Sequence, residues 1–149
     1  MASAEDCYVD PSALRRLYVH EAQSRAFADW RGRTKGALPT TLHGRAELVN
    51  SIMLAVFRGD LKAAAATGAV SDLDDDYAQG RLQLVDLLWR RTLEQAMELS
   101  LEHSSKLGTR TLDVLHVASA LTIGCRRFVT YDERQGKLAR AVGLKVLSP

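Results

Sequence analysis

Four acidic residues in this sequence could act together if the fold brings them close: Asp10, Glu47, Asp113 and Asp132. Carboxylates gathered at one place repel one another and raise each other's pKa values, a conflict that a divalent cation removes. Mg²⁺ and Mn²⁺ prefer oxygen ligands and are often completed by phosphate oxygens of a substrate. Such a cluster would suit metal-assisted hydrolysis of a phosphodiester. The sequence contains no G-x-x-x-x-G-K-[ST] phosphate loop, so nucleoside triphosphate chemistry is unsupported.

Each of these acids also has a purely structural explanation when it is taken singly. Asp10 could cap the helix that follows it, and Asp113 could interact with the dipole of its own helix. Glu47 could be an exposed helical residue, and Asp132 could be a turn residue. Only convergence of the four in space would favour metal binding over these explanations.

Two of the acids are predicted at the carboxyl ends of strands. Asp10 follows the apolar run Cys7–Val9, and Pro11 disfavours helix at Asp10 while suiting a first helical turn. Asp132 follows a second apolar run at 127–131. Because ligands of an open parallel sheet bind outside the carboxyl ends of its strands, we expect both acids at one edge.

The other two acids are predicted on helices. Glu47 lies on the opening turns of a helix that begins at Leu42 and ends near Gly59. Asp113 lies in the first turn of a helix at 111–122, which is apolar on nearly all faces and is therefore expected to be buried.

The rest of the chain also alternates between strands and helices. Further strands are expected at 37–41, 82–87 and 144–147, and further helices at 12–18, 21–30, 61–66, 89–107 and 133–142. Gly68 is expected to end the helix at 61–66, with another helix starting at 71–74, and Gly108 is a plausible C-cap. This alternation predicts an α/β fold with a parallel sheet covered on both faces. No long linker divides the 149 residues, so we expect a single domain over 1–149.

Composition limits the setting of the protein. The net charge of +2 does not by itself indicate a nucleic-acid partner, and the basic residues of the first quarter could simply be solvated. Cys7 and Cys125 lack metal-ligand spacing and are expected to be free buried thiols. No apolar stretch reaches the roughly 18 residues that span a membrane, and the acidic N-terminus is unlike a secretory signal. We therefore expect a cytoplasmic protein without membrane association.

Several motifs in this order resemble the PIN domain family. They are V-D-P-S-A-L at 9–14, Glu47 in the helix after Thr40 and Thr41, D-V-L-H-V-A-S-A at 113–120, and F-V-T-Y-D at 128–132. The resemblance covers nearly the whole chain and is most specific in the last two motifs. It implies a three-layer α/β/α fold with a central, mostly parallel sheet of four to five strands. It further implies a metal-dependent endoribonuclease, similar to the compact VapC-type toxins of toxin–antitoxin pairs.

The resemblance also implies roles for individual residues. Asp10, Asp113 and Asp132 would bind Mg²⁺ or Mn²⁺, and Glu47 would hold or activate a water molecule. Two hydroxyl residues, Ser12 and Thr130, would orient the carboxylates.

Two further residues near these motifs can be interpreted from their positions. Arg110, just before the helix that carries Asp113, could contact a substrate phosphate or pair with a nearby acid. His116 shares a helix face with Asp113, so a supporting role is open. Because its surroundings are apolar, we interpret His116 as a core histidine with a satisfied hydrogen bond.

By the same resemblance, the partners would be an RNA substrate, an antitoxin protein and a second copy of the chain in a homodimer. Two alternatives remain open from the sequence. One is a catalytically weak PIN-like module for binding or assembly in RNA processing. The other is a structure-specific DNA nuclease, although the chain lacks the additional acids and helical insertions usual in that group.

Overall fold

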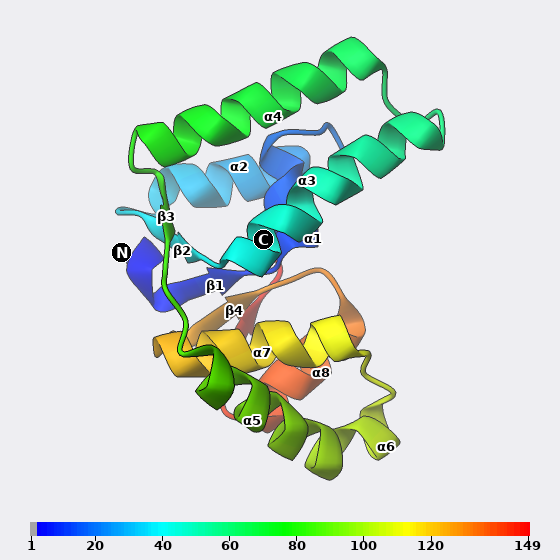
Figure 1. Ribbon diagram of the computed structural model, residues 1–149. Coiled ribbons are helices and arrows are strands. Elements are labelled where there is room, and N and C mark those ends of the chain that lie inside the picture. The colour runs from blue at the N-terminus through cyan, green and yellow to red at the C-terminus, as the bar shows by residue number, and fades with distance from the viewer. Residues whose placement is uncertain (1–2) are drawn as a thin grey trace.

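The computed structural model describes residues 3–149, in which five short strands alternate with helices (Figure 1). The strands are β1 (Cys7–Val9), β2 (Leu38–Thr40), β3 (Leu82–Leu84), β4 (Arg127–Val129) and β5 (Lys145–Leu147). The α-helices are α1 (Pro11–Leu14), α2 (Ser24–Arg33), α3 (Leu42–Phe57), α4 (Ala63–Ala78), α5 (Trp89–Leu99), α6 (Ser105–Leu107), α7 (Thr111–Ile123) and α8 (Glu133–Ala141). The shorter helical elements are η1 (Ala4–Asp6), η2 (Arg15–Leu17) and η3 (Ser100–Ser104), the last a π-helical turn.

All strand pairs in the described chain are parallel. Hydrogen bonds join β1, β4 and β5 in the order β1–β4–β5, and join β2 to β3 in a second ladder. The two ladders meet where β2 lies beside β1. An isolated parallel β-bridge also joins Ser3, which precedes β1, to Lys35, which precedes β2. The sequence prediction of a parallel α/β sheet is thus confirmed. In the register, Val9 pairs with Val129, so the residues that follow β1 and β4 leave the sheet at the same edge.

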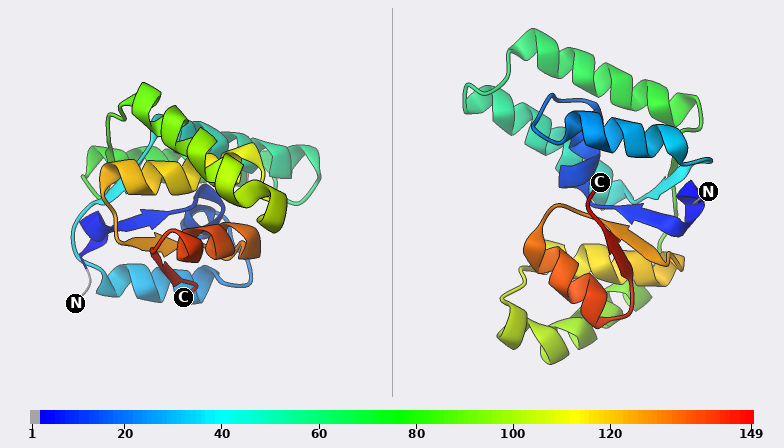
Figure 2. Two further views of the ribbon diagram at one scale, coloured as in Figure 1. Left: turned by 90° about the horizontal axis from the view of Figure 1, so that it is seen from below. Right: turned by 180° about the vertical axis from the view of Figure 1, so that it is seen from behind.

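Helices cover both faces of the sheet because strand side chains alternate in direction. Cys7 and Val9 face a core formed with α1 to α4, whereas Tyr8 and Phe128 face a second core formed with α5, α7 and α8. Figures 1 and 2 show the resulting three layers, with the strands between the two helical groups. Phe128 is fully buried, and burying such a side chain contributes about 1.5–3 kcal/mol. The predicted three-layer α/β/α architecture is therefore confirmed.

One predicted helix boundary is wrong. Gly68 does not end a helix, because α4 runs unbroken through it from Ala63 to Ala78. The glycine lies on the exposed side of the helix and costs only about 1 kcal/mol relative to alanine. Continuing the helix places Ala66, Ala69 and Leu73 on one buried stripe against the core. This tertiary packing outweighs the local preference of glycine.

Other boundaries shift by smaller amounts. The helix expected at 12–18 begins at Pro11 and tightens to the 3₁₀ turn η2, and the one expected at 21–30 is displaced to Ser24–Arg33. The strand expected at 82–87 ends at Leu84, since its partner β2 ends at Thr40. The segment at 89–107 is helical throughout but contains the π-helical turn η3, and Gly108 ends it with φ 67°.

Two expectations from composition can be compared with the structure. Cys7 and Cys125 are both buried and free, as expected. Within residues 3–149, no helix is long and apolar enough to cross a membrane.

Candidate active site

The four acidic side chains of the sequence analysis line one cleft at the carboxyl edge of the sheet, with a volume of about 440 Å³. The remaining lining residues are Ser12, Arg110, Thr111, Leu112 and Gln135. The acids come from four elements, since Asp10 follows β1, Glu47 lies on α3, Asp113 on α7, and Asp132 precedes α8. The tertiary structure therefore brings together residues up to 122 positions apart in the chain (132 − 10).

Asp10 lies deepest in the cleft and is 1 % exposed. Although it occupies the N-cap position of α1, its side chain makes no capping hydrogen bond. Instead, Oδ2 accepts hydrogen bonds from the hydroxyls of Ser12 and Thr130, the latter across 3.4 Å, and Oδ1 accepts one from Gln135 across 3.3 Å. Burial raises the pKa of the Asp10 carboxyl above its usual range, while the hydrogen bonds from Ser12 and Gln135 oppose the rise. The capping explanation of Asp10 is therefore wrong.

Asp113 and Asp132 serve local structure and the cleft at the same time. Oδ2 of Asp113 accepts a hydrogen bond of 2.9 Å from the backbone N–H of Arg110, at the start of α7. Oδ1 of Asp132 accepts one of 2.9 Å from the backbone N–H of Gln135, and so caps α8. The other oxygen of Asp113, Oδ1, accepts a hydrogen bond from Gln135, and both Asp113 and Asp132 line the cleft. A carboxylate at a helix N-terminus is also favoured by the helix dipole.

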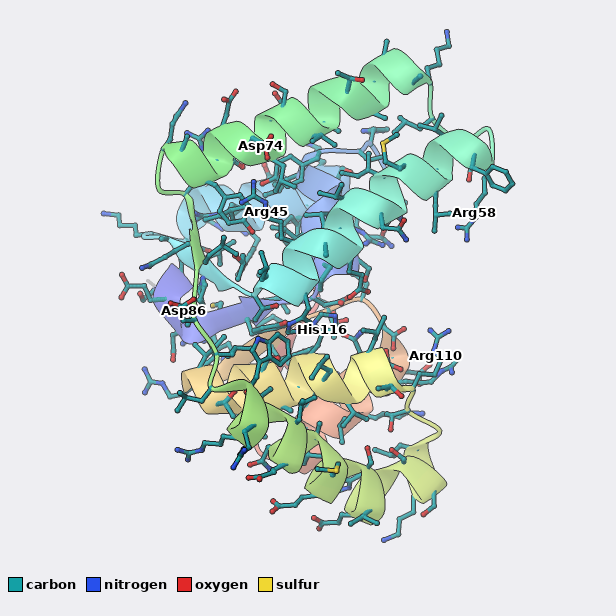
Figure 3. All side chains as sticks on the ribbon, in the orientation of Figure 1. Arg45, Arg58, Asp74, Asp86, Arg110 and His116 are labelled. Atoms are coloured by element: carbon teal, nitrogen blue, oxygen red, sulfur yellow. The ribbon has the colours of Figure 1, made fainter. Side chains whose placement is uncertain are left out.

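Glu47 is anchored by the histidine that the sequence placed in the core. Nε2 of His116 lies 2.6 Å from Oε2 of Glu47, and Nδ1 lies 2.7 Å from the hydroxyl of Tyr8. The imidazole is fully buried, as expected, and both of its nitrogens are bonded. Figure 3 shows His116 on α7, between that helix and the first turns of α3. Its partner, however, is one of the four acids, so packing alone does not describe it.

Sequence reasoning missed Gln135, which links two of the acids. Its amide nitrogen donates to Oδ1 of Asp113 across 3.1 Å and to Oδ1 of Asp10 across 3.3 Å, and the side chain is 5 % exposed. The pattern D-x-x-Q from Asp132 to Gln135 indicates a helix start in the sequence. That pattern does not reveal the contact with two acids from other elements.

Arg110 is the basic residue at the cleft. Its guanidinium is largely exposed, and Nε lies 3.8 Å from Oδ2 of Asp113. An exposed pair at that distance contributes little to stability. The guanidinium is therefore available to an anion entering the cleft, and Figure 3 shows it pointing outward at the start of α7.

The cleft fits a hard divalent cation in the type and charge of its donors. It offers carboxylate oxygens from four acids, two of them nearly buried, against one exposed arginine. Within residues 3–149, no three acidic, histidine or cysteine side chains yet lie close enough to enclose a metal ion. The Gln135 amide stands between Asp10 and Asp113 in this arrangement.

Comparison with known proteins identifies the family. The model of the PIN domain matches residues 7–141. Ribonuclease VapC46 of Mycobacterium tuberculosis (strain ATCC 25618 / H37Rv) is 30 % identical over 144 residues, which cover 95 % of this chain and 96 % of that protein. The crystal structure of M. tuberculosis VapC20, described as a toxin that cleaves the sarcin–ricin loop, superposes with a TM-score of 0.69. It has 17 % identity and covers 96 % of this chain and 99 % of VapC20, and this likeness concerns the fold. From its sequence motifs, its fold and these comparisons, the chain belongs to the PIN domain family.

Proposed function

We propose that this protein is a Mg²⁺-dependent endoribonuclease and the toxin of a type II toxin–antitoxin pair. The observation that carries the proposal is the convergence of Asp10, Glu47, Asp113 and Asp132 on one cleft. A scaffold would gain nothing from gathering four carboxylates, which repel one another without a cation. The related ribonuclease VapC46 supports RNA as the substrate class.

Different residues of the cleft would bind the metal ion, orient its ligands, activate water and bind the RNA. Asp10, Asp113 and Asp132 would hold Mg²⁺, with Mn²⁺ as a substitute, and Ser12, Thr130 and Gln135 fix the direction of the buried carboxylates. When bound, the ion would supply positive charge to the phosphate and increase the acidity of water. Glu47 would orient and deprotonate the attacking water, and Arg110 would bind a phosphate of the RNA.

The direct test is RNA cleavage by the wild type and by Asp10→Asn, each with Mg²⁺ and with EDTA. A hairpin containing the sarcin–ricin loop is a suitable first substrate beside unstructured RNA, because the structurally similar VapC20 is described as cleaving that loop. We expect cleavage only by the wild type with Mg²⁺. Equal RNA cleavage by the wild type and Asp10→Asn would contradict the proposed mechanism. Preferential cleavage of branched DNA would instead identify a DNA nuclease.

The toxin assignment rests on the VapC relatives and has its own test. We expect a small adjacent reading frame that encodes a protein with a DNA-binding N-terminal region. Co-expressed with the chain, that protein should co-purify with it and suppress RNA cleavage. A neighbour that forms no complex would leave a ribonuclease without an antitoxin partner.

A homodimer is the second partner that we propose, formed through an apolar groove between α5 and α7. The groove has a volume of about 580 Å³ and is lined by Leu93, Ala96, Met97, Ser100, Leu101, Thr111, Val114 and Leu115. Exposed arginines (Arg90 and Arg91) open α5, and exposed glutamates (Glu94, Glu98 and Glu102) follow along the same helical segment. Two copies packed antiparallel across a twofold axis would place each arginine pair near the other copy's glutamates.

Two variants, Leu101→Glu and Phe57→Glu, test this face. Leu101 in the groove and Phe57 at the end of α3 are both 87 % exposed, so the changes are matched in exposure. We expect the wild type and Phe57→Glu to sediment as dimers at micromolar concentration, and Leu101→Glu to sediment as a monomer. A monomeric wild type would contradict the dimer itself.

A further inference from the structure

A hydrogen-bonded chain of three side chains leads from the middle of the sheet to the cleft. Tyr8 on β1 contacts Nδ1 of His116 on α7 at 2.7 Å, and Nε2 of His116 contacts Oε2 of Glu47 on α3 at 2.6 Å. These three residues come from three elements, and the two hydrogen-bonded pairs are separated by 108 and 69 positions. Tyr8 and His116 are 2 % and 0 % exposed, so water does not compete for the contact between them.

The chemistry of the groups determines the direction of these hydrogen bonds. Burial raises the pKa of Tyr8 above its usual value, so the residue remains a phenol and can donate its proton. In a neutral imidazole one nitrogen accepts and the other donates. If Nδ1 accepts from Tyr8, then Nε2 carries the proton and donates to the Glu47 carboxylate. The opposite tautomer would direct a nitrogen lone pair at that carboxylate, which is repulsive.

Aromatic packing holds the imidazole in this orientation. The ring of His43 stacks on that of His116, with centroids 5.2 Å apart and an interplanar angle of 24°. Tyr8 in turn stacks on Phe128, with centroids 5.5 Å apart and an angle of 11°. Such contacts between rings add roughly 0.5–1.5 kcal/mol each beyond simple burial. The chain of hydrogen bonds is therefore rigid at its buried end.

At the other end of the chain of hydrogen bonds, the Glu47 side chain contacts both the buried His116 and the cleft. Among residues 3–149, His116 is the one residue that hydrogen-bonds its side chain, and it contacts only Oε2. The Glu47 side chain is 31 % exposed and lines the cleft, so Oε1 remains available to a ligand there. Without this hydrogen bond, the long Glu47 side chain would sample several rotamers. Fixing it in the reactive one would then cost conformational entropy each time the substrate reacts.

We propose that His116, oriented by Tyr8, is a positioning residue that fixes Glu47 as a carboxylate directed into the cleft. This inference rests on the proposed ribonuclease function, in which Glu47 acts on water. His116 itself touches neither substrate nor metal. Its contribution is to hold one oxygen of Glu47 so that the other faces the reacting phosphate.

Three variants separate positioning from packing. His116→Leu removes the donor at similar size, His116→Gln retains an amide that can donate to Glu47, and Tyr8→Phe removes only the distant hydroxyl. Val117→Ala is the control, because Val117 is the next residue on α7 and is fully buried in the apolar core of that face. We expect His116→Leu to lower kcat by about 10- to 100-fold with little change in KM for RNA. His116→Gln should recover part of that loss, and Val117→Ala should reduce stability with wild-type kcat.

A measurement without RNA or metal gives an independent result. Long-range ¹H–¹⁵N NMR should show His116 in the Nε2–H tautomer in the wild type and a mixture of tautomers in Tyr8→Phe. If His116→Leu folds with wild-type kcat, the proposal fails. If that variant does not fold, wild-type kcat and an unmixed tautomer in Tyr8→Phe overturn it. Failure of the ribonuclease assignment is distinguishable, because Asp10→Asn would then match the wild type.

Discussion

The side-chain amide of Gln135 donates to Oδ1 of Asp113 across 3.1 Å, and thereby ties α8 to α7 inside the candidate active site. The same amide reaches Asp10 across 3.3 Å. Its two N–H groups thus satisfy one oxygen on each of two buried carboxylates. The same contact opposes the rise in the pKa of Asp10 that burial causes.

Replacing Gln135 with leucine should destabilise the metal-free protein more than the metal-loaded one. Hydrogen bonds to charged groups contribute roughly 1.5–3 kcal/mol, so we expect a loss of about 2 kcal/mol in EDTA. In excess Mg²⁺ the ion compensates the same oxygens, and the loss should be clearly smaller. Urea denaturation under both conditions measures the difference. As a control, Leu138→Ala, at a fully buried position on α8, should lose the same unfolding free energy in EDTA and in Mg²⁺. Equal losses for Gln135→Leu under the two conditions would contradict the prediction.

Asp10→Asn should trade activity for stability. Burial raises the pKa of Asp10, which means that the folded state disfavours its charged form, and a neutral amide removes that cost. In EDTA at pH 7 the variant should melt above the wild type, and each kcal/mol gained raises Tm by about 2–4 °C for a chain of this size. The advantage should disappear at low pH, where Asp10 itself is protonated. A lower Tm for Asp10→Asn at pH 7 would contradict this account.

His43 should make the fold sensitive to mild acid. Burial lowers the pKa of His43 to about 4, with Glu47 opposing the shift, and its ring packs on Trp89. Because the unfolded state takes up the proton near pH 6.5 and the folded state only near 4, stability should fall as the pH decreases through that window. After discounting for partial exposure, the loss is roughly 1–2 kcal/mol. Between pH 7 and pH 4 the unfolding free energy of the wild type should fall by about that amount relative to His43→Gln. Parallel profiles of the two proteins would contradict this account.

Gly68→Ala should stabilise the protein by about 0.5–1 kcal/mol without changing RNA cleavage. The glycine lies within α4 on its exposed side, and a Cβ atom there would meet nothing within 4 Å. Thermal denaturation measures the gain. Gly44→Ala is the contrasting change, because its Cβ would lie 2.9 Å from the capping hydroxyl of Thr41 and should destabilise α3. A loss on Gly68→Ala would mean that α4 is not continuous.

Local patterns and the family resemblance predicted the fold class and six of the nine residues that line the cleft. Asp10 and Asp132 follow apolar runs, and in a parallel sheet such positions share an edge by geometry. The helix of Asp113 is apolar on nearly every face, which indicated its burial. Helix ends were less certain, as Gly68 shows, because burial of distant side chains decided whether the helix continued.

Only the tertiary structure decided which side chains contact one another. Gln135 is an ordinary first-turn residue of a helix in the sequence, and its role depends on Asp10 and Asp113 arriving from elsewhere. His116 sits in an apolar pattern that correctly predicted burial, but burial does not name its partners, Tyr8 and Glu47. Periodicity reports the direction of a side chain relative to its own helix or strand. Hydrogen bonds between elements depend on distances that packing alone sets, and those distances assemble this cleft.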